Sequence, residues 1–197
     1  MSCRVLSLWG ILYGVRGGSI LRIQTSRFGL IEIKDNDLIQ FPEGILGFGQ
    51  LRQFVLLDDP NDEIFAWLQS CEEPGIAFPV LEPELFDSQY NPALAKSDLS
   101  ALGLAEAKGF RMFTIVTIPK DPTQMTANRK APIIVNVEKR TARQCVLQDN
   151  QLAIREPIFS KLQQRVVQNP QQSIKSQALD WGVAVRVPET AVLESTK

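Results

Sequence analysis

This 197-residue sequence contains no histidine, so cysteines and carboxylates are the main residues whose side chains could take part in catalysis or metal binding. It therefore lacks both the commonest general base near neutral pH and the commonest metal ligand. Cys3, Cys71 and Cys145 are widely spaced and form no C-x-x-C pair, so we expect reduced, buried thiols rather than a zinc or redox site. The residue types favour a binding protein, with no catalytic residue, metal or cofactor, over a hydrolase or metalloenzyme.

The acidic side chains offer the remaining route to catalysis. Asp58 and Asp59 are sequence neighbours, as are Glu72 and Glu73. Acid/base pairs in glycosidases are instead separated carboxylates in environments that push their pKa values apart. The glycines of residues 44–49 also lack the spacing of a dinucleotide-binding fingerprint. An enzyme that uses carboxylates alone is the less favoured alternative.

Charge is distributed unevenly along the chain. Residues 53–95, the acidic segment, carry nine Asp and Glu residues and no Lys or Arg, although the net charge of the whole chain is -1. An anionic surface would speed the docking of a basic partner, and the alternative is an ordinary solvated surface. The tentative partner-binding residues are acids of this segment and two aromatic anchors, namely Asp58, Asp59, Asp62, Glu63, Glu72, Glu73, Phe86, Asp87 and Tyr90.

Basic residues elsewhere are few and poorly interleaved with aromatic residues. The main groups are Arg129 with Lys130, and Lys139 with Arg140 and Arg143. We therefore expect no direct binding to nucleic acid. A small RNA-binding β-barrel that uses residues 139–143 is the runner-up hypothesis.

Short strands are the elements that must position these residues. Residues 20–33 alternate in polarity around a turn and predict a hairpin. Prolines, Pro157 among them, fall between the later apolar runs, which indicates a mainly β fold: a small antiparallel β-barrel-like domain or a sandwich. The later runs are 38–41, 54–57, 64–69, 76–81, 110–118, 133–137, 144–147 and 183–187.

One or two short helices and a C-terminal helical or flexible tail complete the expected fold. Ser97 could cap a helix over residues 97–104. Ile158, Leu162 and Val166 have helical spacing, which predicts a helix that ends at Asn169. A second helix is expected over residues 173–181, and a frayed tail after residue 188.

Three parts of the chain are expected: an N-terminal extension (1–20), a β-barrel domain (21–158) and the tail (159–197). The apolar run at residues 5–15 is too short to span a bilayer, which needs about 20 apolar residues, and no signal-cleavage site follows it. We expect a cytoplasmic protein that is monomeric when free and does not bind a membrane. Attachment to the cell envelope through residues 5–15 is the alternative.

Many short motifs, kept in one order, resemble those of a known family. They occupy residues 26–29, 39–48, 54–57, 67–70, 77–78, 116–119, 125–128, 131–133 and 155–157. In this order and spacing, residues 23–158 resemble the FliW family of bacterial flagellar assembly factors. The motif residues expected to have a structural or binding role are Phe28, Gly29, Phe41, Pro42, Gly44, Gly47, Phe48, Trp67, Gln69, Thr126, Ala127, Asn128 and Pro132.

The resemblance implies a small β-barrel protein without enzymatic activity. Members of the family bind CsrA, a dimeric RNA-binding translational repressor, away from its RNA site, and they also bind flagellin before its secretion. Accumulating flagellin would displace CsrA, which then stops flagellin translation. The sequence departs from the family pattern at Arg129, where an apolar residue is usual, and at Leu152, where an aromatic residue is common.

Several of these residues also have a purely structural interpretation. Residues 41–48 read as a strand exit and a tight turn anchored by phenylalanines. The alternating pattern around Trp67 places it in the core rather than at an interface, and Asn128 is expected to stabilise a turn. Phe86 and Tyr90, close to Asp87, are better interface candidates.

Overall fold

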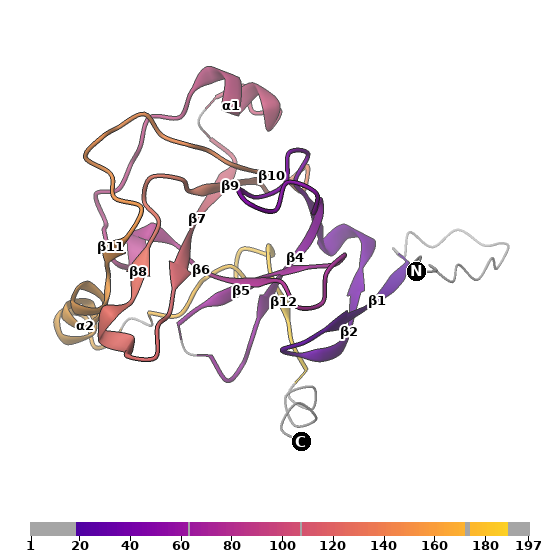
Figure 1. The fold of residues 1–197 in the computed structure, drawn as a ribbon, viewed down its shortest axis with the longest axis horizontal. Coiled ribbons are helices and arrows are strands. Elements are labelled where there is room, and N and C mark those ends of the chain that lie inside the picture. The colour runs from indigo at the N-terminus through magenta and orange to yellow at the C-terminus, as the bar shows by residue number, and fades with distance from the viewer. Residues whose placement is uncertain (1–18, 63, 107, 172–173, 189–197) are drawn as a thin grey trace, which may run out of the picture.

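Seven strands close into a ring in the part of the chain that the structure, a computed structural model, describes: residues 19–62, 64–106, 108–171 and 174–188. The order is β7–β6–β5–β4–β3–β10–β9, and β9 pairs back to β7 (Figure 1). The ring strands are β3 (Leu38–Gln40), β4 (Gln53–Asp58), β5 (Ala66–Ser70), β6 (Ala77–Leu81), β7 (Phe110–Thr117), β9 (Ile133–Asn136) and β10 (Thr141–Gln144).

The pairing within the ring is antiparallel except between β3 and β10, which run parallel and meet at Gln40 and Thr141. Closure of the ring leaves no long unpaired edge within it, which protects a small sheet from edge-to-edge association. The expected mainly β, barrel-like fold is confirmed.

Strand β4 explains why this barrel has two hydrophobic layers. Phe54 and Leu56 point into the interior cluster, and Val55 and Leu57 point outward into a second cluster. All four are at most 1% exposed. Alternate residues of a strand face opposite sides of a sheet, so a continuous apolar run is stable only where both sides are covered.

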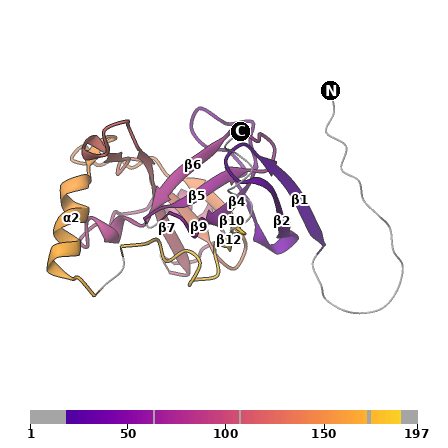
Figure 2. The ribbon, with the colours of Figure 1, turned by 90° about the horizontal axis from the view of Figure 1, so that it is seen from below.

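The outer cover over β4 and β5 is the predicted hairpin, formed by β1 (Ile20–Thr25) and β2 (Gly29–Lys34). Helix α2 (Phe159–Gln168) lies on the opposite side of the barrel in both views (Figure 1, Figure 2). It packs near β8 (Thr126–Ala127) and β11 (Glu156–Pro157) through Leu162 and Ile158. Helix α1 (Lys96–Ala101) precedes Leu102, which is buried against Ile134.

Residues 174–188, here called the C-terminal strap, return across the barrel after α2. They end in β12 (Val185–Arg186), which pairs in parallel with the end of β4. The predicted helix over 173–181 is wrong for the described residues: a turn ends at Gly182, whose φ is +64°. The backbone N–H of Gln177 donates to the Glu82 carboxylate rather than to a preceding carbonyl. This tertiary contact is the reason why the helix does not form.

Expectations about single elements are corrected as well. Pro157 lies within β11, at the outer edge of the β7–β8–β11 extension, where a missing N–H is tolerated. The strand expected at 144–147 is instead β10, which ends at Gln144. The predicted α2 is confirmed to within one residue of its expected end. Helix α1 is confirmed as well, but it runs from Lys96 to Ala101, three residues short of the expected end, and its N-cap is Ala95 rather than Ser97. The run at 5–15 and the tail after 188 lie outside the described residues.

Candidate partner-binding surface

The described residues of the acidic segment do not form a continuous anionic face. Asp58 and Asp59 are 1% and 5% exposed, so the expectation that they face solvent is wrong. The Asp58 carboxylate lies 3.2 Å from both Lys175 Nζ and Arg186 Nε, which come from the C-terminal strap. Asp59 accepts the backbone N–H of Asn61 at 2.9 Å. Both acids thus hold the fold together where β4 ends.

Two further acids serve the local backbone. Asp62 accepts the backbone N–H groups of Ile64 and Phe65, and its other oxygen accepts Trp67 Nε1 at 3.0 Å. Glu72 is exposed, yet it accepts the backbone N–H groups that lead into β4, including Gln53 at 3.1 Å. The carboxylates therefore bridge loop and strand ends.

The exposed acids in the described part of the acidic segment are Glu72, Glu73 and Glu84. Glu63 lies outside the described residues. The surface available to a basic partner is consequently smaller than the nine acids of the sequence suggested. Partner binding by these residues stays a prediction.

The predicted aromatic anchors are part of the packing. Phe86 is 7% exposed and belongs to the cluster beneath α2. Tyr90 is half-buried, its hydroxyl donates to the Arg129 carbonyl at 2.5 Å, and burial raises its pKa. The Arg129 guanidinium lies over the Tyr90 ring at 5.1 Å and 2.7 Å from Asp87.

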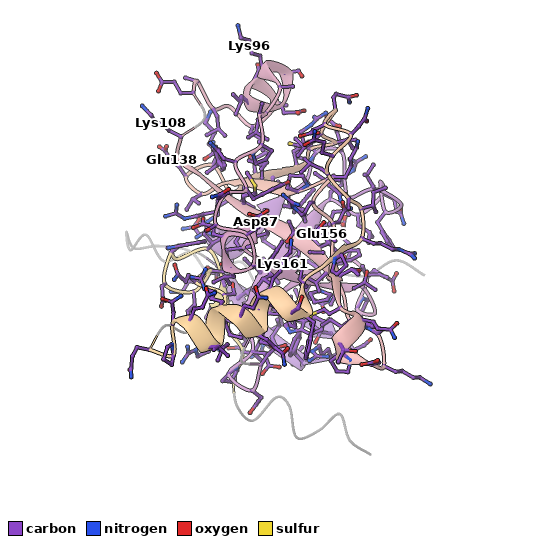
Figure 3. All side chains as sticks on the ribbon, turned by 90° about the vertical axis from the view of Figure 1, so that its left-hand side faces the viewer. Asp87, Lys96, Lys108, Glu138, Glu156 and Lys161 are labelled. Atoms are coloured by element: carbon purple, nitrogen blue, oxygen red, sulfur yellow. The ribbon has the colours of Figure 1, made fainter. Side chains whose placement is uncertain are left out.

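Arg129 also connects this loop to β11 and α2. Its guanidinium is 3.7 Å from Glu156, and Lys161 of α2 contacts the same carboxylate. Asp87, Glu156 and Lys161 lie together on this face (Figure 3). The hydrogen bond from Lys161 holds the pKa of Glu156 below its usual range. The sequence signalled this site only through the unusual Arg129.

Glu82 is a functional candidate that the sequence reasoning did not single out. Its side chain is 2% exposed, and Oε1 accepts Ser176 Oγ at 2.9 Å and the Gln177 N–H at 3.0 Å. Its second oxygen, Oε2, is buried and has no hydrogen-bond partner among the described residues. Burial raises the pKa of Glu82 to about 7, against the lowering effect of these hydrogen bonds. No local motif marks it, because both donors lie more than 90 residues away.

The glycine motif forms a tight turn, as expected. Gly44 and Gly47 have φ values of +71° and +85°, which side-chain-bearing residues rarely adopt. Phe41, before Pro42, is fully buried against Phe54, and Phe48 packs edge-on against Phe78. These motif residues shape one end of the barrel.

Other motif residues also stabilise the structure. Phe28 is buried and meets Trp67 edge-on at 6.3 Å, next to the turn made by Gly29. Trp67 is 9% exposed, which confirms its expected core position. The guanidinium of Arg27 lies 3.7 Å from the centre of the Trp67 ring.

The remaining motif positions surround the turn that joins β8 to β9. Thr126 and Ala127 form β8, and Asn128 Oδ1 accepts the Ala131 N–H at 3.0 Å, which confirms its expected turn role. Pro132 is buried, and its carbonyl accepts the Cys145 N–H at 2.9 Å. Gln69 in β5 is fully buried and donates through Nε2 to the carbonyls of Ser70, Pro74 and Ile76.

Both described thiols are shielded from solvent. Burial raises the pKa of both Cys71 and Cys145 to about 12, which keeps them protonated near neutral pH.

Within the described ranges, no cluster of three or more Cys, Asp or Glu side chains is arranged to hold a metal ion. Nor is any helix described there long and apolar enough to cross a membrane.

The basic segment proposed for RNA contacts is committed to intramolecular contacts. Lys139 donates to the Gly103 carbonyl at 3.1 Å. Arg140 donates to two strap carbonyls, and Arg143 pairs with Glu43 and Asp98. A nucleic-acid phosphate would have to replace these contacts.

A closed ring of seven short strands, with a hairpin packed on its outside and helix α2 on the opposite side, defines a small β-barrel protein. The sequence comparisons assign it further. The chain belongs to the FliW family, whose model, described as FliW protein, matches residues 22–158.

Relatives named flagellar assembly factor FliW agree with this assignment. That of Bdellovibrio bacteriovorus is 67% identical over 165 residues, which cover 84% of this chain and 94% of the relative. That of Leptospira biflexa is 39% identical over 143 residues, 72% of this chain and 94% of the relative. A crystal structure of the flagellar assembly factor FliW aligns with a TM-score of 0.65 at 33% identity, covering 70% of this chain and 96% of the other.

Proposed function

We propose that this protein is a cytoplasmic, non-enzymatic flagellar assembly factor that binds the translational repressor CsrA and flagellin in turn. The observation that carries the proposal is the FliW match over residues 22–158, with 67% identity to a relative of that name. Bound CsrA would be kept from repressing the flagellin message, and accumulating flagellin would displace it. Mutually exclusive binding suffices for this switch, because each partner lowers the apparent affinity for the other by mass action.

The exposed acids support an electrostatic contribution to binding a basic partner. Glu73 and Glu84 are the suitable positions for charge reversal, because reversing the buried Asp58 or Asp59 would unfold the end of β4. Complementary charge at an interface mainly raises the association rate and is screened by salt. The monomeric state of the free protein and the boundary at residue 158 stay predictions.

Calorimetric titration of the full chain with purified CsrA and with flagellin tests the proposal. We expect each partner to bind alone and flagellin to release CsrA from a preformed complex. The variant E73K/E84K should bind a basic partner more weakly and with less salt dependence than E106K/E138K, which makes the same charge change at exposed sites outside the acidic segment. Failure of the wild-type chain to bind either partner contradicts the function. Equal affinities of the two variants contradict only the role of these acids.

A further inference from the structure

The C-terminal strap fills a groove with an acidic floor and a strand edge as its wall. Lys175 and Arg186 of the strap both contact the buried Asp58 carboxylate. The Val187 N–H donates to the Asp58 carbonyl at 2.9 Å, next to the parallel pairing of β12 with β4. At residues 185–187 the strap is therefore bound as a basic extended peptide would be bound by strand addition, whereas residues 178–182 form a turn.

Apolar side chains fix the register of the strap in this groove. Val183 and Val187 are each 1% exposed, and they contact the interior cluster and the hairpin cluster, respectively. Arg140 donates to the carbonyls of Gly182 and Val183, and Arg111 lies over the Trp181 ring at 4.3 Å. Pockets for alternate side chains together with backbone hydrogen bonds are the usual basis of peptide recognition by a sheet edge.

The groove is incompletely matched to the strap at Glu82. This carboxylate receives Ser176 Oγ and the Gln177 N–H on one oxygen, while Oε2 is buried without a hydrogen-bond partner among the described residues. A buried acceptor that lacks a donor disfavours the bound state. A ligand with one more donor at this position would satisfy it better than the strap does.

The strap also lies outside the matched family region, which ends at residue 158. The Leptospira interrogans relative aligns over 140 residues, which cover 71% of this chain and 93% of the relative. The barrel wall that forms the groove, β4, lies inside the matched region. The strap thus lies outside the matched family region, whereas the strand with which it pairs lies inside it.

We propose that this groove is a docking site for a basic, extended segment of a partner protein, and that the strap occupies it in cis as an intramolecular competitor. A partner that uses the groove must displace the strap. Its apparent affinity is therefore its intrinsic affinity multiplied by the fraction of molecules in which the strap is undocked. Only the link to particular partners rests on the proposed function; the peptide-binding groove is tested without it.

The first step of the test releases the strap from the full chain. K175E/R186E places carboxylates beside buried Asp58, and K120E/R155E makes the same charge change at exposed positions as the matched control. Hydrogen exchange should accelerate at Ser176, Gln177 and Val187 in the first variant alone, with the amides of β5 and β6 still protected. If the barrel amides also lose protection, the milder K175Q/R186Q takes its place.

The second step offers the groove a labelled peptide of residues 174–188, followed by fluorescence anisotropy. We expect the released variant to bind this peptide saturably and at least tenfold more tightly than either wild type or K120E/R155E, and a scrambled peptide to bind none of them. Strap release without tighter peptide binding overturns the groove, and so does equal binding of the scrambled peptide.

CsrA and flagellin then test the link to function. At least one of them should bind the released variant severalfold more tightly than wild type. If the peptide binds but neither partner gains affinity, the competitor role toward these partners is overturned. If neither partner binds the wild type at all, the proposed function fails while the groove stands.

Discussion

The hydroxyl of Ser176 donates to Oε1 of Glu82 across 2.9 Å and joins the C-terminal strap to the end of β6, 94 residues earlier. This contact buries a carboxyl group whose second oxygen has no described donor. The free energy of docking the strap is consequently tied to the protonation of one side chain. The absence of histidine makes that dependence measurable, because no imidazole titrates in the same pH range.

Stability should fall as the pH rises from about 4.5 to about 7 and then level off. Burial raises the pKa of Glu82 to about 7 in the folded chain, so between these values the folded state holds a proton that the unfolded state has lost. The shift corresponds to about 3 kcal/mol of unfolding free energy. Urea unfolding at pH 5 and pH 8 measures it.

Nearby charges set the controls for this experiment. Glu84 adds to the raised pKa of Glu82. Two cations, Lys175 of the strap and Arg165, which donates to the Glu84 carbonyl, line the same cavity as Ser176 and Gln177. Glu156 and Asp121 have lowered pKa values and titrate below the window. Glu82→Gln should flatten the profile, and the exposed Glu84→Gln should change it little. A flat wild-type profile would contradict the assignment.

Replacing Arg129 with Met should lower the unfolding free energy by about 2 kcal/mol, because Asp87 and Glu156 then lose a cation in a largely buried setting. Arg22→Met removes an exposed pair with Glu32 and should change stability by less than about 0.5 kcal/mol. Chemical unfolding of both variants provides the comparison. A double variant with Asp87→Asn should recover part of the loss, and strict additivity would refute a direct coupling.

Gly44→Ala should destabilise the protein more than Gly47→Ala. Both positions have positive φ, which disfavours a Cβ by about 1–2 kcal/mol. A Cβ at Gly44 would also lie 2.7 Å from the Gly49 Cα and the Phe48 carbonyl oxygen, whereas one at Gly47 meets no described heavy atom within 4 Å. Thermal melts of the two variants measure the difference, and equal losses would show that the turn relaxes.

Cys71 and Cys145 should resist alkylation in the native state. Burial raises the pKa of both thiols to about 12, so the thiolate fraction at pH 8 is small. Iodoacetamide treatment followed by peptide mass mapping, with and without urea, gives the reactivity of each position. Rapid native labelling at Cys145 would show that the β9–β10 region opens readily.

Local patterns in the sequence were sufficient for most of the barrel. The hairpin, the continuous run of β4 and the spacing of Ile158, Leu162 and Val166 each follow from burial at a fixed period, which is a property of neighbouring residues. The turn at Gly44 is likewise local, since its positive φ selects glycine. The order of the short motifs was enough to indicate the family.

Tertiary structure alone decided how the acids are used. The sequence shows nine acids in one segment, but Asp58 is neutralised by Lys175 and Arg186, which follow it by 117 and 128 positions. The helix expected at 173–181 does not form because the Gln177 N–H is donated to Glu82 rather than to a preceding carbonyl. Composition and periodicity describe neighbours along the chain, whereas burial and ion pairing depend on which distant segments the closed barrel brings together.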